Sequence, residues 1–415
     1  MSDPISGGAK PESYNGRWWM LLGVWLLYLS FGLNIAALAP LVPVIESDLG
    51  MSHSAMGRVL GAWQFVFILS AIPCGILLDR LGARWAMLGG ALLMAVSAFW
   101  RSIATDEISL LLAVAVFGLG GPIISTGAPK VVSAWFESRQ RGLAMGIYVT
   151  GPGIGAIVGL LLTNAVLLPA LDNDWRQVLR LWGFFTLITA LAWFVISCRL
   201  TMAPSHLRKL QTIDLGLLPL LRHPVVRLLL LMSIGVFAIN HGIGNWLPEL
   251  LRASGRTISQ ASHLAALMVL VSVISALTIP RLATGQYRLI ILFMLCLSSV
   301  CAMVLLRVPT GMPLFAGLVF QGIATGSIMT IMMLILVETP GIGERRAGTA
   351  GGLYFSTAEI GGVGGPVMLG VVYDATGGFA TGLTVLCCIG LVLACCVWAL
   401  RYFVGKTTTE SAGVG

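Results

Sequence analysis

The chain has 415 residues, of which 57% are hydrophobic and 10% are charged, and its mean hydropathy is +0.93. A soluble fold of this length cannot cover so much apolar surface, so the composition excludes a soluble enzyme or binding domain. The net charge of +8 fits basic loops on one side of a membrane better than a nucleic-acid partner. We therefore expect a membrane protein that does not bind nucleic acid.

Apolar runs recur along the whole chain. A hydrocarbon core of about 30 Å needs about 20 residues of helix. The sequence predicts an all-α membrane protein with about twelve transmembrane helices. Their predicted ranges are 18–45, 55–78, 85–103, 109–136, 142–168, 177–200, 228–251, 261–280, 289–307, 312–337, 348–372 and 380–403.

The basic residues predict the orientation of these helices. Lys10 and Arg17 precede the first run, which is too long for a signal peptide and therefore stays as a helix. With the N-terminus on the cytoplasmic side, most of the 25 Lys and Arg residues fall in inner loops and tails. We expect a multi-pass protein of the inner (plasma) membrane with both termini in the cytoplasm.

The sequence contains no sign of a cofactor, a metal site or a catalytic motif. The eight cysteines fall in or beside apolar runs without the paired spacing that zinc needs, so they are expected to be packing residues. A phosphate-binding loop, a nucleophile elbow and a zinc-protease helix are also missing from the sequence. We expect neither an ATP-driven pump nor an enzyme.

The two halves of the chain repeat one pattern. Gly142 aligns with Gly348, and the same alignment matches Tyr148 with Tyr354 and Gly155 with Gly361. A shared Tyr and shared Gly positions in one register favour two six-helix halves related by an axis along the membrane normal. The predicted divisions are a tail at 1–17, a bundle at 18–200, a linker at 201–227, a bundle at 228–403 and a tail at 404–415.

One charged turn separates the second and third apolar runs. It reads Gly75-x-x-x-Asp79-Arg80-x-Gly82-x-Arg84. In a soluble protein such a turn is usually a solvated loop, but here both flanks are membrane spans. The pattern resembles the signature turn between helices 2 and 3 of the major facilitator superfamily. This resemblance implies two pseudo-symmetric six-helix bundles that work by alternating access around a central cavity.

Two further stretches resemble particular branches of that superfamily. The end of helix 4 and the start of helix 5, from Gly127 to Gly146, are similar to the cyanate or nitroimidazole transporter-like proteins and the nitrate/nitrite porters. Residues Asn245 to Leu250 are similar to the first of these branches. Helix 2 lacks the intramembrane Arg of nitrate porters, because its one Arg, Arg58, lies at the outer edge. Nitrate itself is therefore not expected as the substrate.

The turn and a second glycine motif are expected to act in gating. In the conformer open to the outside, Asp79 is expected to lie at the positive N-terminal end of helix 11. Helix 5 contains Gly151-Pro152-Gly153-x-Gly155, which resembles the Gly-Pro signature of proton-driven exporters. Glycines let helix 5 approach the other half and Pro152 bends it. Close packing without a gating role is the alternative. The predicted gating residues are Gly75, Asp79, Arg80, Gly82, Arg84, Gly151, Pro152 and Gly155.

Ionisable groups inside a membrane are rare because each costs at least about 2.5 kcal/mol at the bilayer centre. Glu359, near the middle of helix 11, is the expected proton carrier; the alternative is a neutral Glu bonded to a neighbouring helix. Lys130 either holds an anionic substrate or extends to the cytoplasmic surface. His241 in helix 7 is expected to bind protons or substrate. Four other groups, His53, His263, Glu46 and Glu249, are expected at the outer boundary.

The family resemblance implies that polar and aromatic side chains at mid-depth line the cavity. The predicted substrate-binding residues are Tyr28, Asn34, Gln64, Lys130, Tyr148, Asn240, His241, Gln321 and Tyr354. The sequence thus predicts a monomeric secondary transporter of a small organic anion, such as a monocarboxylate, that is coupled to protons and surrounded by membrane lipids. A proton-coupled exporter of lipophilic or cationic drugs is the first alternative, and a transporter-like receptor is the second.

Overall fold

The structure is a computed structural model that describes residues 13–136, 138–200, 221–308, 310–339 and 343–412. Every regular element within these ranges is a helix. The elements are α1 (Ser13–Ala36), η1 (Ala39–Leu41), α2 (Val42–Leu49), α3 (His53–Arg101), α4 (Glu107–Trp135), α5 (Ser138–Leu162), η2 (Thr163–Leu167), α6 (Leu168–Ala170), α7 (Trp175–Arg199), α9 (Pro224–Ala253), α10 (Ile258–Leu282), η3 (Gly285–Tyr287), α11 (Arg288–Leu305), α12 (Gly311–Glu338), α13 (Gly343–Thr376) and α14 (Phe379–Ala412).

The expected all-helical membrane fold is confirmed. The described residues contain 11 helical segments that are long and apolar enough to cross a membrane. One of them, α3, has 49 residues and bends at Gly82, whose φ of 76° and ψ of 159° are not helical. Glycine tolerates this backbone conformation because it has no Cβ atom. The two arms of α3 match the predicted helices 2 and 3, so the described residues contain the twelve predicted membrane segments.

The first predicted helix differs from the structure. It was expected to run without a break to residue 45, but α1 ends at Ala36 and the chain continues through η1 into α2. Pro40 and Pro43 lie in the first turns of these two short elements. A proline has no amide hydrogen to donate, so a continuous helix is interrupted there.

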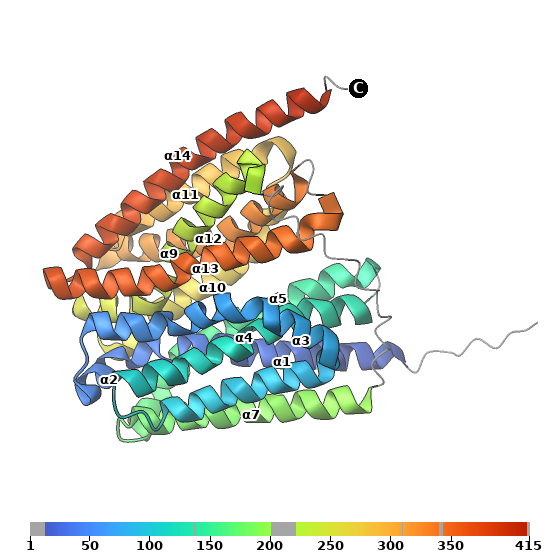
Figure 1. Cartoon of the computed structure of the whole chain (residues 1–415). Coiled ribbons are helices and arrows are strands. Elements are labelled where there is room, and N and C mark those ends of the chain that lie inside the picture. The colour runs from blue at the N-terminus through green and yellow to red at the C-terminus, as the bar shows by residue number, and fades with distance from the viewer. Residues whose placement is uncertain (1–12, 137, 201–220, 309, 340–342, 413–415) are drawn as a thin grey trace, which may run out of the picture.

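The helices form two bundles (Figure 1). The N-terminal bundle holds α1 to α7, and the C-terminal bundle holds α9 to α14. Two pairs of helices make the main contacts between the bundles, α3 with α13 and α5 with α10. The first residues of α1 and the last residues of α14 lie at the same end of the molecule (Figure 1). We call this the termini end and the opposite end the far end.

The predicted linker and N-terminal tail fall largely outside the described residues. Residues 1–12, 201–220 and 413–415 are not described. Within the described chain, α9 begins at Pro224, before the predicted start of the second bundle at 228. The last helix continues to Ala412, beyond the predicted boundary at 403.

Glycines bring equivalent helices together in both bundles. A Cβ atom at Gly155 of α5 would lie 1.9 Å from the carbonyl oxygen of Leu29 in α1. The aligned residue of the second half, Gly361 of α13, would meet the carbonyl oxygen of Ile234 in α9 at the same distance, 1.9 Å. The two halves therefore share one helix-packing device, as the sequence repeat predicts.

Two glycines of α5 contact a different helix from the one that the sequence predicted. Gly151 and Gly155 face α1 of their own bundle and not the other half. Within this motif, Gly153 faces the C-terminal bundle, because a Cβ atom there would lie 2.2 Å from Val273 Cγ2 of α10. Successive residues of a helix point about 100° apart, so neighbouring glycines serve different partners.

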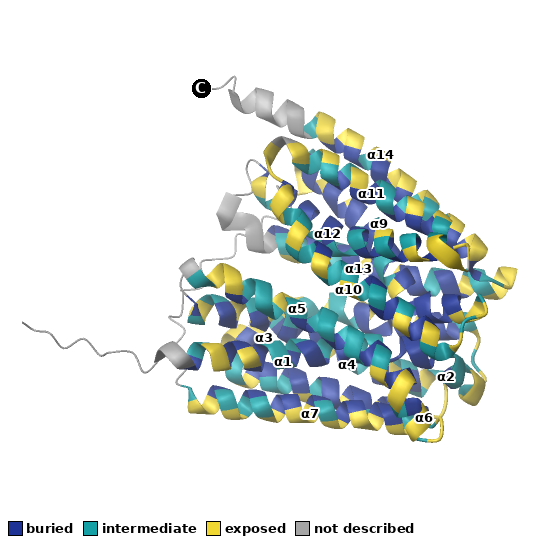
Figure 2. Ribbon diagram, turned by 180° about the vertical axis from the view of Figure 1, so that it is seen from behind, coloured by how far each residue is buried: buried dark blue, intermediate teal, exposed yellow. Residues whose placement is uncertain are grey.

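Large apolar side chains cover the outside of both bundles. Leu69, Ile72 and Trp398 are each more than three-fifths exposed. Figure 2 shows such exposed residues on the outer faces of the helices, with buried residues between them. An apolar outer surface of this extent fits a lipid environment and not water.

Candidate functional site

Three of the predicted functional side chains meet in the middle of the interface between the bundles. They are Gln64 of α3, His241 of α9 and Glu359 of α13. Gln64 Nε2 lies 3.3 Å from His241 Nδ1. A Cβ atom at Gly362 would lie 2.4 Å from Glu359 Oε2, 3.3 Å from Gln64 Cγ and 3.4 Å from His241 Cδ2. We call these three side chains the central cluster.

The helix faces explain how the first member of the cluster is positioned. Gly57 and Gly61 of α3 lie against the backbone of α13 at Pro366 and Val363. Gln64 follows them on the same face of α3, because residues four and seven positions apart share a face. The glycines let α3 approach α13 closely enough for Gln64 to reach the cluster.

A similar arrangement positions His241. Gly361 and Gly365 of α13 lie against the backbone of α9 at Ile234 and Ala238. His241 comes one turn after Ala238 on that face. The close contact of α9 with α13 thus sets the imidazole beside Glu359.

The cluster is nearly closed to solvent. Glu359 is 5% exposed and Gln64 is 0% exposed, whereas His241 is partly exposed. Glu359 Oε2 and Gln64 Oε1 are buried acceptors that have no hydrogen-bond partner. Unpaired polar atoms are costly in an apolar interior. A proton on Glu359, or a donor group of a bound molecule, would relieve this cost.

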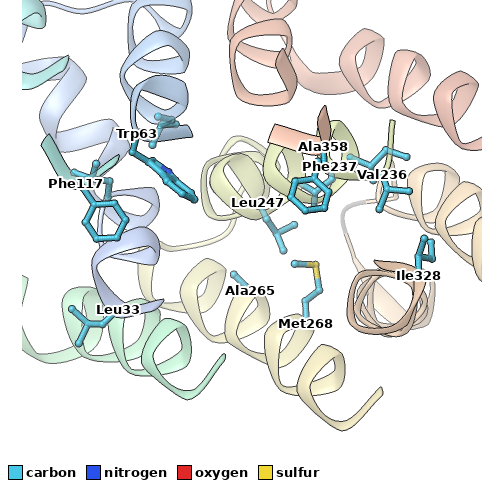
Figure 3. Packing of buried hydrophobic residues seen from close by; sticks show 14 of the residues in the cluster. Leu33, Trp63, Phe117, Val236, Phe237, Leu247, Ala265, Met268, Ile328 and Ala358 are labelled. Atoms are coloured by element: carbon cyan, nitrogen blue, oxygen red, sulfur yellow. The ribbon is translucent and has the colours of Figure 1, made fainter. Parts of the chain in front are cut away.

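Aromatic rings surround the cluster. The Trp63 and Phe237 rings lie 5.9 Å and 5.4 Å from the His241 ring. Phe117 packs edge-on against Trp63, and Phe355 against Phe237. Figure 3 shows Trp63 and Phe117 on the N-terminal bundle and Phe237 on the C-terminal bundle. The cluster therefore combines a few polar groups with apolar walls, as binding sites for small molecules do.

A second polar network joins two more of the predicted residues within the C-terminal bundle. Ser299 donates to Gln321 Oε1 over 3.0 Å, and Gln321 Nε2 donates to Thr325 Oγ1 over 3.1 Å. Thr325 in turn donates to Asn240 Oδ1 over 3.0 Å. The network ends one residue before His241. It links α11 and α12 to α9.

The other predicted substrate residues lie elsewhere. Tyr28 and Tyr148 pack against each other between α1 and α5, with ring centroids 5.5 Å apart. Asn34 donates to Ser30 O and to Thr186 Oγ1 inside the N-terminal bundle. Tyr354 is 0% exposed, inside the C-terminal bundle. The structure does not bring these four residues to the central cluster.

Lys130, for which the sequence left open a substrate contact or an extension to the cytoplasmic surface, also lies apart from the central cluster. Its Nζ atom is 2.5 Å from Asp79 Oδ1, at the termini end of the N-terminal bundle. Both side chains are partly exposed, Lys130 at 43% and Asp79 at 62%. Arg288 and Glu338 form the corresponding ion pair in the C-terminal bundle.

The rest of the charged turn packs lightly. Arg84 Nη2 donates to the Leu200 carbonyl at the end of α7, and Arg80 is exposed. A Cβ atom at Gly75 would meet nothing within 4 Å. The turn is thus held by its own bundle.

The described contacts between the bundles run from the far end to the middle. At the far end, the backbone amides of His53 and Ser54 donate to the Asp374 carboxylate over 3.2 and 2.8 Å. Asn164 donates to Ser262 across the interface over 2.8 Å. Towards the termini end the bundles diverge (Figures 1 and 2). The conformer is closed at the far end.

Sequence reasoning missed the contacts of two residues, Arg101 and His53. Arg101, the last residue of α3, is 2% exposed. It donates to the Asn34 carbonyl over 3.1 Å where α1 ends, and its guanidinium lies over the Phe117 ring. His53, predicted to lie at the outer boundary, is in contact with the other bundle. Neither position has a sequence signal, because both depend on contacts between distant segments.

Metal binding receives no support from the described residues, among which no group of three His, Cys, Asp or Glu side chains could hold an ion. All eight cysteines are free.

Comparisons with known proteins extend over most of the chain. The model of the Major Facilitator Superfamily matches residues 24–366. The cyanate transport protein CynX of Escherichia coli is 25% identical over 392 residues, which cover 90% of this chain and 95% of CynX. The nitrite extrusion protein of Bacillus subtilis is 24% identical over 381 residues, which cover 90% of this chain and 92% of that protein.

The same fold is present in a solved structure. A bacterial homologue of the human lysosomal transporter Spinster superposes with a TM-score of 0.77 at 16% identity, over 95% of this chain and 98% of the other. The family model, the relatives and the fold agree that the protein is a secondary transporter of small molecules and not an enzyme. This chain belongs to the Major Facilitator Superfamily.

Proposed function

We propose that this transporter moves a small organic anion, such as a monocarboxylate, together with a proton. The observation that carries this proposal is the meeting of Gln64, His241 and Glu359 between the bundles. A group that binds substrate and proton at this interface can respond to the movement of either bundle. The likeness to transporters named for cyanate and nitrite supports an anion as the cargo.

The chemistry of the cluster fits one anionic group and one proton. The amide of Gln64 and the N–H of the neutral His241 ring can both donate to a carboxylate. Glu359 takes up the coupled proton, because an ionised carboxylate and an ionised cargo together are too costly in this interior. Trp63 and Phe237 provide apolar contacts for the remainder of an organic anion.

We further propose that Asp79 changes partner during the transport cycle. In the conformer described here it pairs with Lys130 of its own bundle. When the termini end closes, Asp79 lies against the positive N-terminal end of α13. Gly75, Gly82, Arg80 and Arg84 shape this turn. Lys130 accordingly belongs to the gate and not to the substrate site.

The glycines of α5 have a supporting role in this scheme. Gly151, Pro152 and Gly155 hold α5 tightly against α1. The N-terminal bundle can therefore move as one unit. We assign the termini end to the cytoplasmic side of the inner membrane, following the distribution of basic residues, and expect the protein to act as a monomer in contact with membrane lipids.

A specific observation favours one other cargo. Glu359 is an acidic group among aromatic side chains, and the described ion pairs give it no cationic partner. Aromatic rings and a carboxylate also bind lipophilic cations. Export of such cations in exchange for protons is therefore the second candidate function.

Purified protein in liposomes with a trapped pH dye distinguishes the two. We expect lactate or gluconate added outside to acidify the lumen, with protein-free liposomes as the background. Lys130→Ala is expected to retain binding of these anions, because Lys130 lies outside the cluster. If only lipophilic cations such as ethidium drive proton movement, the anion proposal is wrong.

A further inference from the structure

A second titratable site crosses the bundle interface at the far end. His53 is the first residue of α3. Its ring stacks on Tyr373 of α13 with centroids 3.8 Å apart and an interplanar angle of 4°. On α9, Trp246 is nearly parallel to the same ring at 5.2 Å. An imidazole of the N-terminal bundle thus packs among aromatic rings of the C-terminal bundle.

Carboxylates from both bundles face the two ring nitrogens. His53 Nδ1 is 3.4 Å from Glu46 Oε2 of α2, and Nε2 is 3.9 Å from Glu249 Oε1 of α9. The side chains are 15% exposed for His53, 10% for Glu46 and 0% for Glu249. Glu46 Oε1 and His53 Nε2 are buried atoms without a hydrogen-bond partner.

The remaining charges near the ring do not cancel these carboxylates. Arg252 of α9 pairs with Glu249, with 2.6 Å between Nη2 and Oε1. Asp374 of α13 accepts hydrogen bonds from the first two amides of α3. Tyr373 contributes a phenol and Phe379 of α14 contributes only an apolar ring. Three carboxylates therefore surround the site with one arginine.

We propose that His53, Glu46 and Glu249 form a second proton-binding site, which holds the far end closed when it is occupied. A proton on His53 places a positive charge between Glu46 of one bundle and Glu249 of the other. The open conformer loses Glu249, Tyr373 and Trp246 from the site. Because this proton binds the closed conformer more tightly, it shifts the population towards closure. Acid at the far end therefore opposes opening.

This proton is distinct from the one transported in the proposed function. The central cluster couples a proton to the cargo, whereas the His53 site regulates how often the far end opens. The two are joined along one face of α3, where Gly57 and Gly61 lie between His53 and Gln64 against α13. Opening at His53 therefore also separates this face from α13.

Hydrogen exchange followed by mass spectrometry tests the site without any substrate. The amides of His53 and Ser54 are bonded to Asp374 across the interface, so they exchange when the far end opens. Peptides from the start of α3 and the end of α13 are compared in the wild type and His53→Gln at pH 5.5 and pH 8. The intrinsic exchange rate cancels in the ratio of the two proteins at each pH.

We expect the wild type to be protected roughly tenfold more than His53→Gln at pH 5.5, and about equally at pH 8. His263→Gln is the matched control, because His263 of α10 contacts Ser259 of its own helix; it should change neither ratio. Glu46→Gln keeps the stacked ring and should reduce the acid effect as well. If the ratio of wild type to His53→Gln, or of wild type to Glu46→Gln, is the same at both pH values, the proposal is overturned.

Discussion

Glu359→Gln should abolish accumulation of substrate driven by a pH gradient and leave exchange of substrate across the membrane intact. Gln has the shape of a protonated Glu but cannot release a proton. Net uptake needs that release, whereas exchange of one cargo molecule for another does not. Radiolabelled substrate in liposomes measures both, and we expect accumulation to fall to the protein-free background.

The control is a carboxylate outside the central cluster. Glu107 pairs with Arg58 at the far end of the N-terminal bundle, 2.7 Å from its guanidinium. Glu107→Gln should accumulate substrate as the wild type does. Persistent accumulation in Glu359→Gln would remove this residue from proton coupling, and loss of exchange together with uptake would favour the cation exporter.

Gly155→Ala should have the largest effect on stability. The added methyl group would lie 1.9 Å from the Leu29 carbonyl oxygen, so α5 and α1 have to separate along their contact. Overpacking of this kind costs about 3 kcal/mol. We expect a lower melting temperature in detergent and a poorer yield of folded protein. Gly361→Ala should lower the melting temperature in the same way, because its Cβ atom would lie 1.9 Å from the carbonyl oxygen of Ile234.

Gly146→Ala is the matched control on the same helix. A Cβ atom there would meet nothing within 4 Å, and alanine favours helix by up to about 1 kcal/mol over glycine. It should therefore be neutral or slightly stabilising. Equal melting temperatures for the two variants would mean that the contact between α5 and α1 is not as close as described.

The global fold follows from the sequence because its signals are local. Length and hydropathy define the twelve crossings, and the repeat that pairs Gly155 with Gly361 predicts two equivalent halves. The break after Ala36 was missed, although Pro40 and Pro43 mark it. Hydropathy averages over such prolines, so it finds the crossing and not the interruption.

The candidate site was only partly predictable. The sequence draws attention to Glu359, His241 and Gln64, because polar groups inside apolar helices cost free energy and usually have a function. Their meeting depends on which glycine faces which helix, and single-sequence reasoning gave Gly151 and Gly155 the wrong neighbour. The positions of Lys130 and His53 were predicted only from how far along its membrane helix each residue lies. Their true partners, Asp79 and the aromatic rings of the other bundle, come from distant parts of the chain.

Distances between spin labels at the two ends test alternating access most directly. Thr105 and Thr376 report on the far end, and Leu143 and Leu282 on the termini end; all four residues are exposed. In a variant without exposed cysteines, adding substrate and changing pH should lengthen one distance as the other shortens. Asp79→Asn should shift the population towards the conformer closed at the far end. If the two distances change together, or neither responds, the bundles do not alternate and the account is wrong.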